Sequence, residues 1–331
     1  MHETGLWQDV QELPESLAST LEARAGVRAA AALLGAPDVR RVVVSGNGAA
    51  YYVAMALWLA SLEGAGGPEV VAAPSGLLAR GTFRWRDGDR FVAVSSSGEF
   101  RDLVEAVDAG VPSPYVAVTA NPDSTLGSRA GVRALVRVLH QRAVTHTQAF
   151  CGGVAIALAI WAEVTSDATL ARELDGLALT VAGLLEPARE WARSAGDLDP
   201  ASAIAFGSGP GWASALEAAL LLKEVAGVAA EGVETREGAT SAMMALQPGH
   251  LVLSLPAAAD PLVEEAEEIC RGRGATVLRA PSAGGADRRL SAVTSHPAAA
   301  ALAAAIGLAR GVDVDRPAWT DDYYRVARQT T

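Results

Sequence analysis

The sequence predicts an α/β fold in which two consecutive domains each contain a parallel β-sheet flanked by helices on both faces. Short apolar runs typical of buried strands alternate with helical patterns along most of the chain. The same alternation begins again near residue 203, which suggests a second copy of the same unit. At 331 residues, half of them apolar, the chain is long enough for two domains with sizeable cores.

The first half alternates predicted strands with predicted helices. The strands are the apolar runs Arg41–Val44, Glu69–Ala73, Arg90–Val94, Tyr115–Thr119 and Ala134–Val138. Apolar residues at helical spacing predict helices over Tyr51–Leu62, Phe100–Val107, Val144–Val164 and Leu170–Ser194. Residues 1–24 are polar at first and then helical in pattern, so we expect an N-terminal arm or helix that lies on the main body.

The second half repeats this order. Its predicted strands are Ala203–Phe206, Leu251–Leu255 and Ala275–Leu278, and its predicted helices are Trp212–Val225, Pro261–Arg271 and Ala298–Ala309. A glycine turn follows the first strand of each half, Gly46-Asn47-Gly48 in one and Gly207-Ser208-Gly209 in the other, which indicates an internal duplication. We expect an arm over residues 1–24, a first domain over 25–195, a second over 196–310 and a tail over 311–331.

Composition excludes several classes of partner. The formal net charge of −11 argues against nucleic acid and against an anionic membrane, because both require a basic face. The longest apolar runs, around Cys151–Trp161 and Ala298–Ile306, are expected to be too short to span a bilayer. Two distant cysteines, Cys151 and Cys270, form neither a disulfide framework nor a metal site. The first residues lack the basic region of a signal peptide, so we expect a cytoplasmic protein.

No cofactor is expected. The third glycine of the dinucleotide fingerprint G-x-G-x-x-G is replaced by Tyr51 in the first half and Trp212 in the second. The second strand ends in Ala73-Pro74-Ser75, with no acidic residue to hold a ribose hydroxyl. The G-x-x-x-x-G-K-[ST] loop of nucleoside-triphosphate binders is also missing.

A serine loop, Ser95-Ser96-Ser97-Gly98, lies where the strand Arg90–Val94 leads into a predicted helix. Hydroxyls and unpaired backbone N–H groups at the start of a helix form an anion site, and phosphate is its usual occupant. The structural alternative is a serine-rich turn in which one serine caps the helix. We predict a phosphate or sulfate site made by Ser95, Ser97 and backbone amides.

These motifs resemble the double sugar-isomerase (SIS) domain family, and in particular the isomerase half of glucosamine-6-phosphate synthase and its stand-alone relatives. The matching segments are Gly46-Asn47-Gly48-Ala49-Ala50, Ser95-Ser96-Ser97-Gly98-Glu99, Gly207 through Lys223-Glu224, and Asp313 to Pro317. The sequence shows no glutaminase domain, so we do not expect ammonia transfer from glutamine within the chain.

The resemblance implies specific roles. Gly46, Asn47 and Gly48 of the glycine turn, the four residues Ser95, Ser96, Ser97 and Gly98, and Thr147 would bind a sugar phosphate. Glu224 would be the base that moves a proton between C1 and C2 of an opened sugar; the alternative is a solvated charge at a helix end. His146 occupies the place of a small hydroxyl residue and is a second candidate acid/base, although a packing role is the more common one for such a histidine.

Four departures from the family pattern leave the function open. Ala50 replaces a hydroxyl residue, Phe100 a threonine, Thr240 the region of a histidine, and Asp322 the region of a lysine. The first hypothesis is an isomerase, aminosugar-phosphate deaminase or deglycase. The second is a non-catalytic or repurposed protein that binds a phosphorylated sugar. The third is an enzyme for a non-phosphorylated substrate, with Phe100 filling part of the phosphate pocket. In each case we expect a homodimer and a small-molecule ligand.

Overall fold

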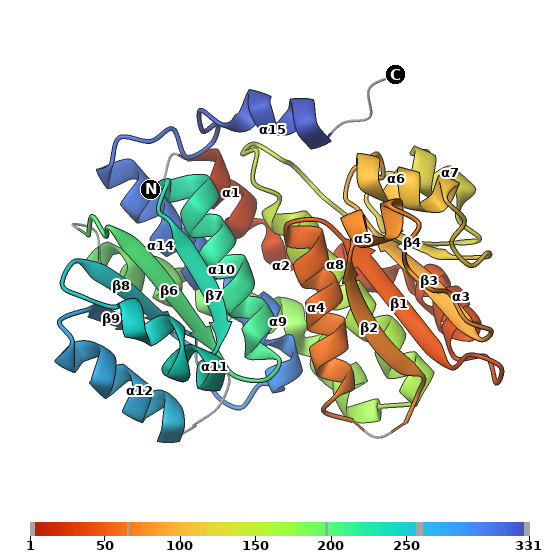
Figure 1. Cartoon of the computed structure of the whole chain (residues 1–331), viewed down its shortest axis with the longest axis horizontal. Helices are drawn as coiled ribbons and strands as arrows, with labels where there is room; N and C mark the ends of the chain where they lie inside the picture. Colours follow the sequence, from red (N-terminus) through yellow and green to blue (C-terminus); the bar gives the residue numbers. More distant parts are fainter. Residues whose placement is uncertain (1–3, 65, 196–197, 256–260, 328–331) are drawn as a thin grey trace. The chain divides into compact units, whose positions relative to one another are not determined.

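The structure is a computed structural model that describes residues 4–64, 66–195, 198–255 and 261–327. It contains two parallel β-sheets, one of five strands in the order β2-β1-β3-β4-β5 and one of four strands in the order β7-β6-β8-β9 (Figure 1). Every strand pair within these sheets is parallel, and helices flank both sheets. The predicted α/β class is therefore confirmed.

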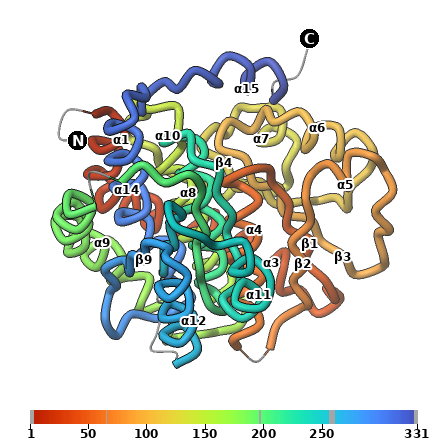
Figure 2. The backbone as a smooth tube through the Cα atoms, turned by 60° about the vertical axis from the view of Figure 1, so that its left-hand side comes forward, coloured from red at the N-terminus to blue at the C-terminus, as the bar shows by residue number. Residues whose placement is uncertain are grey.

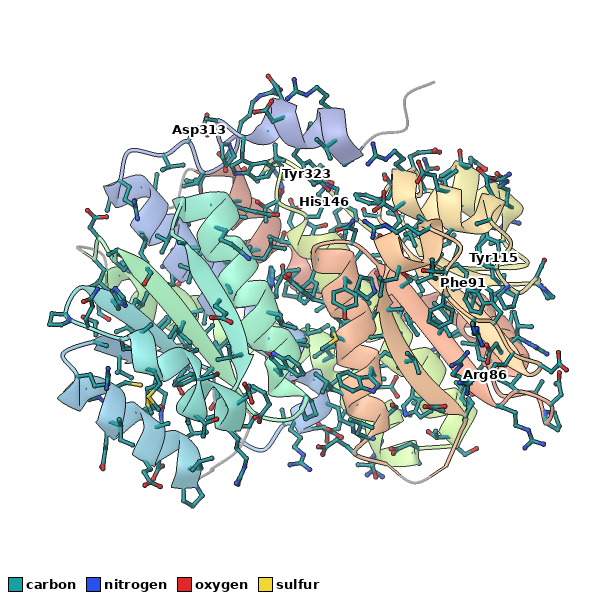
Figure 3. The ribbon with its side chains drawn as sticks, viewed as in Figure 1. Arg86, Phe91, Tyr115, His146, Asp313 and Tyr323 are labelled. Atoms are coloured by element: carbon teal, nitrogen blue, oxygen red, sulfur yellow. The ribbon has the colours of Figure 1, made fainter. Side chains whose placement is uncertain are left out.

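The five-stranded sheet is formed by the first half of the chain. Its strands are β1 (Arg41–Gly46), β2 (Glu69–Pro74), β3 (Asp89–Val94), β4 (Val116–Thr119) and β5 (Val132–Leu135). Its shorter helices are α3 (Arg24–Leu34), α4 (Ala49–Ser61), α5 (Ser75–Ala79), α6 (Arg101–Asp108) and α7 (Thr125–Arg129). Helix α4 packs on β1 and β2, and α3 packs on β5. Phe91 and Tyr115 are buried together in the core on this sheet (Figure 3).

The four-stranded sheet follows the long helices α8 (Thr147–Thr165) and α9 (Ala168–Ser194) along the chain, as the tube in Figure 2 shows. Its strands are β6 (Ser202–Gly207), β7 (Ala230–Glu234), β8 (His250–Ser254) and β9 (Thr276–Arg279). The helices of this half are α10 (Gly211–Ala226), α11 (Thr235–Thr240), η1 (Ala242–Ala245), α12 (Pro261–Gly272), η2 (Arg288–Leu290), α13 (Ser291–Thr294) and α14 (His296–Ala309). Helix α10 packs on β6, β7, α13 and α14.

The two sheets repeat one scaffold. β1 begins at Arg41 and β6 at Ser202, an offset of 161 residues, and the same offset separates the start of β2 from β7 and of β3 from β8. Constant spacing over three strands and two connections is not expected by chance. It supports the predicted internal duplication.

The structure adds elements that the pattern did not predict. Strand β7 carries only one large apolar side chain, Val233, and is ordered by its pairing with β6. A Cβ at Gly232 would lie 2.4 Å from the Ala215 carbonyl oxygen, so glycine is required for α10 to approach β7. The predicted arm is the two helices α1 (Gly5–Gln11) and α2 (Leu13–Glu22), with Leu6 and Trp7 fully buried, and α15 (Thr320–Ala327) lies in the predicted tail.

The chain divides into two compact units, which we name after their sheets. The five-strand unit contains residues 15–139, 148–177 and 319–331, and the four-strand unit contains residues 1–14, 140–147 and 178–318. The predicted domain boundary between residues 195 and 196 adjoins residues 196–197, which lie outside the described residues. The predicted boundaries stay predictions.

Two helical stretches in the described part of the chain, Thr147–Thr165 and Arg288–Ala309, are long and apolar enough to cross a membrane by length and composition alone. The prediction that the longest apolar runs are too short to span a bilayer was therefore wrong about length, because the helices extend beyond the apolar runs. In each stretch, 83% of the apolar window is buried inside the protein, as in the core helices of a soluble protein.

Candidate functional site

The carboxyl ends of β1 and β3 are neighbours in the five-stranded sheet, with Ser45 paired to Ala93. The strand order reverses between them, since the chain runs from β1 to β2 on one side and from β3 to β4 on the other. Loops at such a reversal are the usual place for ligands in open α/β sheets. The glycine turn Gly46–Gly48 and the serine loop Ser95–Gly98 both lie at this edge.

The glycine turn is compact. A Cβ at Gly46 would lie 2.4 Å from the Ala50 carbonyl carbon, and Gly48, at φ +54°, precedes the first residue of α4. The N–H groups of Ala50 and Tyr51 donate to the carbonyls of Asn47 and Gly48, at 3.1 and 2.9 Å. The exposed Asn47 is thus the polar side chain of this turn, and Ala50 adds no hydroxyl to it.

Two hydroxyls of the serine loop differ in exposure: that of Ser95 is buried and that of Ser97 is exposed. The Ser95 hydroxyl is buried and accepts a hydrogen bond from the Gly98 N–H at 3.1 Å, so it shapes the loop from within. The Ser97 hydroxyl is exposed and accepts from the Glu99 N–H at 3.2 Å, which leaves its own hydrogen available. Among the described residues, the backbone N–H groups of Ser96 and Ser97 have no hydrogen-bond partner. Two N–H groups and an outward hydroxyl can together hold an anion.

Gly98 fixes the loop against α7. It has φ +69°, and a Cβ there would lie 1.9 Å from the Ser124 hydroxyl oxygen. Its carbonyl accepts from the Leu126 N–H at 3.0 Å, and the Glu99 carboxylate accepts from the Thr125 N–H at 2.7 Å. The loop is therefore held closely to the first turn of α7.

The position of Phe100 bears on two expectations for this loop, a serine N-cap and a phosphate pocket filled by Phe100. Helix α6 begins at Arg101, and its N-cap is Phe100, which has no side-chain cap bond; a serine cap is therefore not present. Phe100 packs against the core cluster of the five-strand unit, so it is a core residue at the place of the family threonine. This packing weakens the hypothesis in which Phe100 fills a phosphate pocket.

Glu224 lies in the last turn of α10 in the four-strand unit and is partly exposed. Burial raises the pKa of Glu224 to about 7, and the neighbouring Lys223 acts in the opposite direction. A carboxylate of this basicity is suited to accept a proton near neutral pH. Seven residues earlier on the same helix face lies Glu217, which is 3% exposed.

Glu217 and His296 form a buried pair that the sequence patterns did not reveal. The Glu217 Oε1 lies 4.0 Å from the His296 Nδ1, and among the described residues Oε2 of Glu217 has no hydrogen-bond partner. Burial, with the nearby Glu224 adding to it, raises the pKa of Glu217 well above its usual value. Burial lowers the pKa of His296 to about 4. Burial therefore favours the neutral form of both side chains. The sequence feature that could have indicated this pair is the histidine His296 in the alanine-rich apolar helix α14.

His146 and Thr147, also in the four-strand unit, lie just before and at the start of α8. His146 is labelled in Figure 3; its Nδ1 is buried without a hydrogen-bond partner among the described residues, and burial lowers its pKa. The hydroxyls of Thr145 and Thr147 are buried and unpartnered in the same way. Three adjacent residues thus carry polar atoms that no described protein group satisfies.

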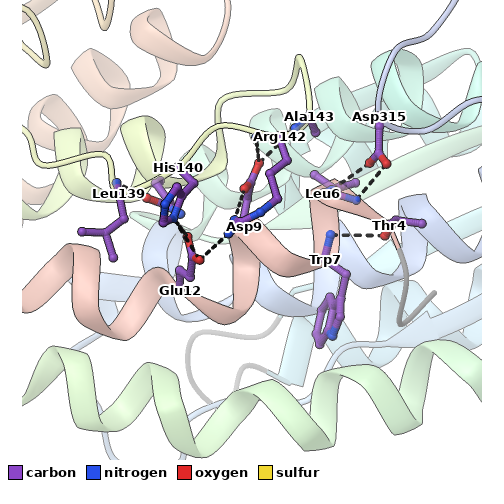
Figure 4. A network of polar contacts seen from close by, with 12 residues as sticks. Thr4, Leu6, Trp7, Asp9, Glu12, Leu139, His140, Arg142, Ala143 and Asp315 are labelled. Atoms are coloured by element: carbon purple, nitrogen blue, oxygen red, sulfur yellow. Dashed lines mark hydrogen bonds and ion pairs between the residues drawn. The ribbon is translucent and has the colours of Figure 1, made fainter.

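The residues directly before this segment in the chain are bound to α1 and its C-cap by a network of polar contacts (Figure 4). The Asp9 carboxylate accepts from the backbone N–H groups of Arg142 and Ala143, at 2.8 and 3.0 Å, and from the Arg142 guanidinium at 2.8 Å. Glu12 binds the side chains of Arg142 and His140. No sequence pattern singled out Asp9, whose burial depends on contacts with residues more than 130 positions away.

The structure thus places Gly46, Asn47, Gly48, Ser95, Ser96, Ser97 and Gly98 at one edge of the five-stranded sheet, and Glu224, His146 and Thr147 in the four-strand unit. At the remaining departures from the family pattern, the Thr240 hydroxyl bonds to backbone carbonyls of its own helix, and Asp322 pairs with Arg325. Among the described residues, no cluster of His, Cys, Asp and Glu could hold a metal ion, and both cysteines are buried and unbridged.

No known protein-family model matches the chain. The glutamine–fructose-6-phosphate aminotransferase (isomerizing) of Aeropyrum pernix is 27% identical to it over 350 residues, which cover 94% of this chain and 55% of that enzyme. The chain spans about half the length of the curated relatives it matches.

Two solved structures have a similar fold. The C-terminal domain of glucosamine-fructose-6-phosphate aminotransferase from Francisella tularensis has a TM-score of 0.81 at 19% identity, over 95% of this chain and 98% of that one. Glucosamine-6-phosphate deaminase from Thermotoga maritima has a TM-score of 0.78 at 17% identity, with the same coverage. These likenesses confirm the predicted fold, and with the curated relative they confirm the predicted resemblance to the double sugar-isomerase family.

Replacing Gly98 by alanine should destabilise the protein more than the same change at Gly81. Both glycines have similar positive φ angles, +69° and +64°, which cost an alanine about 1–2 kcal/mol. Only at Gly98 does the new Cβ meet another atom, so we expect a further ~1–3 kcal/mol there. Urea unfolding of Gly98→Ala and Gly81→Ala measures the difference, and equal losses would show that Ser124 moves away without cost.

Replacing Glu217 by glutamine should stabilise the protein increasingly as pH rises. The raised pKa means that Glu217 keeps a proton on folding that the unfolded chain releases above about pH 4.5, so wild-type stability falls as pH rises toward the folded pKa. The advantage of Glu217→Gln should grow above that pH by at most about 1.4 kcal/mol per pH unit. Chemical unfolding between pH 4 and 9 measures it, with the exposed Glu190→Gln as the control. A pH-independent difference would contradict the buried neutral acid.

Proposed function

We propose, on the premise of the double sugar-isomerase family to which the chain is similar along nearly its whole length, that this protein acts on a sugar phosphate. The proposed reaction is proton transfer on the opened sugar, as in an isomerase or in an aminosugar-phosphate deaminase or deglycase. The observation that supports this most directly is the serine loop, where two N–H groups and the Ser97 hydroxyl are available at the ligand edge of a parallel sheet.

In this proposal the serine loop binds the phosphate, and the glycine turn lies next to the serine loop at the same edge of the sheet. Ser96 and Ser97 donate to the phosphate oxygens, while Ser95 stays within the loop as the acceptor for Gly98. Backbone N–H groups suit a dianion because they add partial positive charge without a counter-ion that would need its own partner. A net negative protein can hold phosphate in this way.

Glu224 is the proposed base. With a pKa of about 7 it is substantially ionised at neutral pH yet basic enough to accept a proton from a carbon next to a carbonyl. The enediolate that forms needs a hydrogen-bond donor, and a neutral His146 with an unpartnered Nδ1 or the Thr147 hydroxyl is the proposed donor. We propose that the protein is a homodimer, as the resemblance implies, and that it is cytoplasmic, as its sequence composition predicts.

The second candidate is a protein that binds a sugar phosphate without turning it over. Ala50, Phe100, Thr240 and Asp322 support it, because the first two add no hydroxyl to the loops and the last two make local structural contacts. Both candidates predict binding at the serine loop. They differ in proton exchange at the sugar carbons.

Alanine at both Ser96 and Ser97 should weaken sugar-phosphate binding without lowering the stability of the unliganded protein. Each hydroxyl–phosphate hydrogen bond is worth about 1.5–3 kcal/mol, or roughly 10- to 100-fold in affinity. Thermal-shift titration with glucosamine 6-phosphate and fructose 6-phosphate measures this. Ser128→Ala on exposed α7 should behave as wild type, whereas Ser95→Ala should lower the unliganded melting temperature because the Gly98 N–H loses its acceptor. An unchanged ligand shift in the double variant would place the phosphate elsewhere.

Glu224→Gln should abolish solvent deuterium exchange at C1 or C2 of the sugar while binding persists. Loss of a positioned base costs about 10²–10⁴ in rate. In the wild type the exchange rate should rise with pH up to about 7 and then level, because the ionised form of Glu224 is the active one. NMR of fructose 6-phosphate in D₂O from pH 5 to 9 measures both. Binding without exchange in the wild type would favour the non-catalytic candidate, and full exchange in Glu224→Gln would assign the base to another residue.

A further inference from the structure

We propose that Asp9 is a positioning residue for His146 and Thr147, acting through the backbone that leads to them. The inference rests on the proposed function, in which these two side chains serve the sugar ligand. It concerns a carboxylate on the N-terminal helix α1 that neither the loop motifs nor the resemblance singled out. The position of Asp9 is shown in Figure 4.

Asp9 holds main chain rather than only side chains. Its Oδ2 accepts from the N–H groups of two consecutive residues, Arg142 and Ala143, at 2.8 and 3.0 Å. The next N–H along the chain, that of Val144, donates to the Asp315 carbonyl at 2.9 Å. Three consecutive amides are therefore fixed immediately before residues 145–147, whose side chains carry three buried polar atoms without a hydrogen-bond partner among the described residues.

Asp315, whose carbonyl binds the Val144 N–H, is itself bound to α1 through its side chain. The Asp315 carboxylate accepts from the N–H groups of Gly5 and Leu6, at 2.7 Å each, at the N-terminus of α1. Negative charge is favourable at this end of a helix. Helix α1 and the chain around Asp315 thus hold residues 142–144 from two directions. Residues 145–147 therefore follow directly after a backbone segment that is fixed by hydrogen bonds.

The charge of Asp9 matters because of its burial. Asp9 is 1% exposed and is balanced by the Arg142 guanidinium, which donates to Oδ1 at 2.8 Å. An asparagine has one acceptor oxygen in place of two, so it cannot accept from both the backbone N–H groups and the Arg142 guanidinium. In either orientation its amide group faces a donor, which weakens the contact with residues 142 and 143. A substrate-contacting segment shifted by about 1 Å can cost about 10²-fold in rate.

Glu12 provides a matched control in the same network. It lies three residues from Asp9, at the end of α1, and its carboxylate binds the Arg142 guanidinium at 2.6 Å and the His140 ring at 3.0 Å. These bonds reach side chains, so Glu12→Gln removes one charge from the network but leaves the amides of residues 142 and 143 bonded to Asp9. A general loss of stability through α1 would affect both variants, whereas positioning would affect Asp9→Asn far more.

The experiment compares the wild type, Asp9→Asn, Asp9→Glu and Glu12→Gln in the full chain. Amide hydrogen exchange by mass spectrometry on peptides covering residues 140–148 reports the backbone directly. Deuterium exchange into fructose 6-phosphate reports turnover, and titration with inorganic phosphate reports the serine loop. For Asp9→Asn we expect faster amide exchange over residues 142–147, a 10- to 100-fold slower reaction, and phosphate affinity within about twofold of the wild type. Asp9→Glu should recover part of the rate, and Glu12→Gln should match the wild type.

Three results would overturn the proposal: unchanged amide exchange over residues 142–147 in Asp9→Asn, a wild-type reaction rate despite faster amide exchange, or the same losses in Glu12→Gln. A wild type that neither binds nor exchanges fructose 6-phosphate and glucosamine 6-phosphate would instead refute the proposed function. The amide exchange of the four proteins still decides in that case whether Asp9 fixes the segment. If Asp9→Asn does not fold, Asp9→Glu carries the comparison.

Discussion

The parallel pairing of β1 with β3 is the constraint on which the proposed phosphate site depends. Parallel neighbours end at the same edge of a sheet, and here the connections leave in opposite directions, so the glycine turn and the serine loop remain together at that edge. Gly46 and Gly98, where a Cβ would lie 2.4 and 1.9 Å from another atom, lie in these two loops. In the serine loop the backbone N–H groups of Ser96 and Ser97 have no hydrogen-bond partner among the described residues, so they are available to a ligand at this edge.

Three carboxyl groups of the four-strand unit have different surroundings. Asp9 accepts hydrogen bonds from backbone amides and from a guanidinium. Glu217 has a pKa that burial raises well above its usual value, and it lies beside the buried imidazole of His296. Glu224 lies between these extremes, partly exposed and with its pKa near neutrality. Of the three carboxyl groups, Glu224 has the surroundings that suit the proposed proton transfer near neutral pH.

The sequence was informative where a local pattern decides the structure. The β-branched run Val42–Val44 and the glycine turn after it predicted β1 and its loop correctly, because a buried parallel strand needs continuous apolar residues. Strand β7, with Val233 as its one large apolar residue, follows from pairing with β6 and was missed. Asp9 and His296 were missed for a related reason: their polar partners lie 79 to 134 positions away, and no local sequence pattern reflects such contacts. The proposed roles of the site residues come from the resemblance, and their burial and partners come from the structure.

The offset of 161 residues implies that the two copies of the scaffold have specialised. At that offset the positions of Ser96 and Ser97 are taken in the second copy by Ala257 and Ala258, while the position of Glu224 is taken in the first copy by Glu63, which is exposed beyond the end of α4. The hydroxyls of the serine loop thus occur in the first copy, and the glutamate with the raised pKa occurs in the second. Under the proposed function, neither half excised as a minimal domain would carry both the phosphate loop and the base.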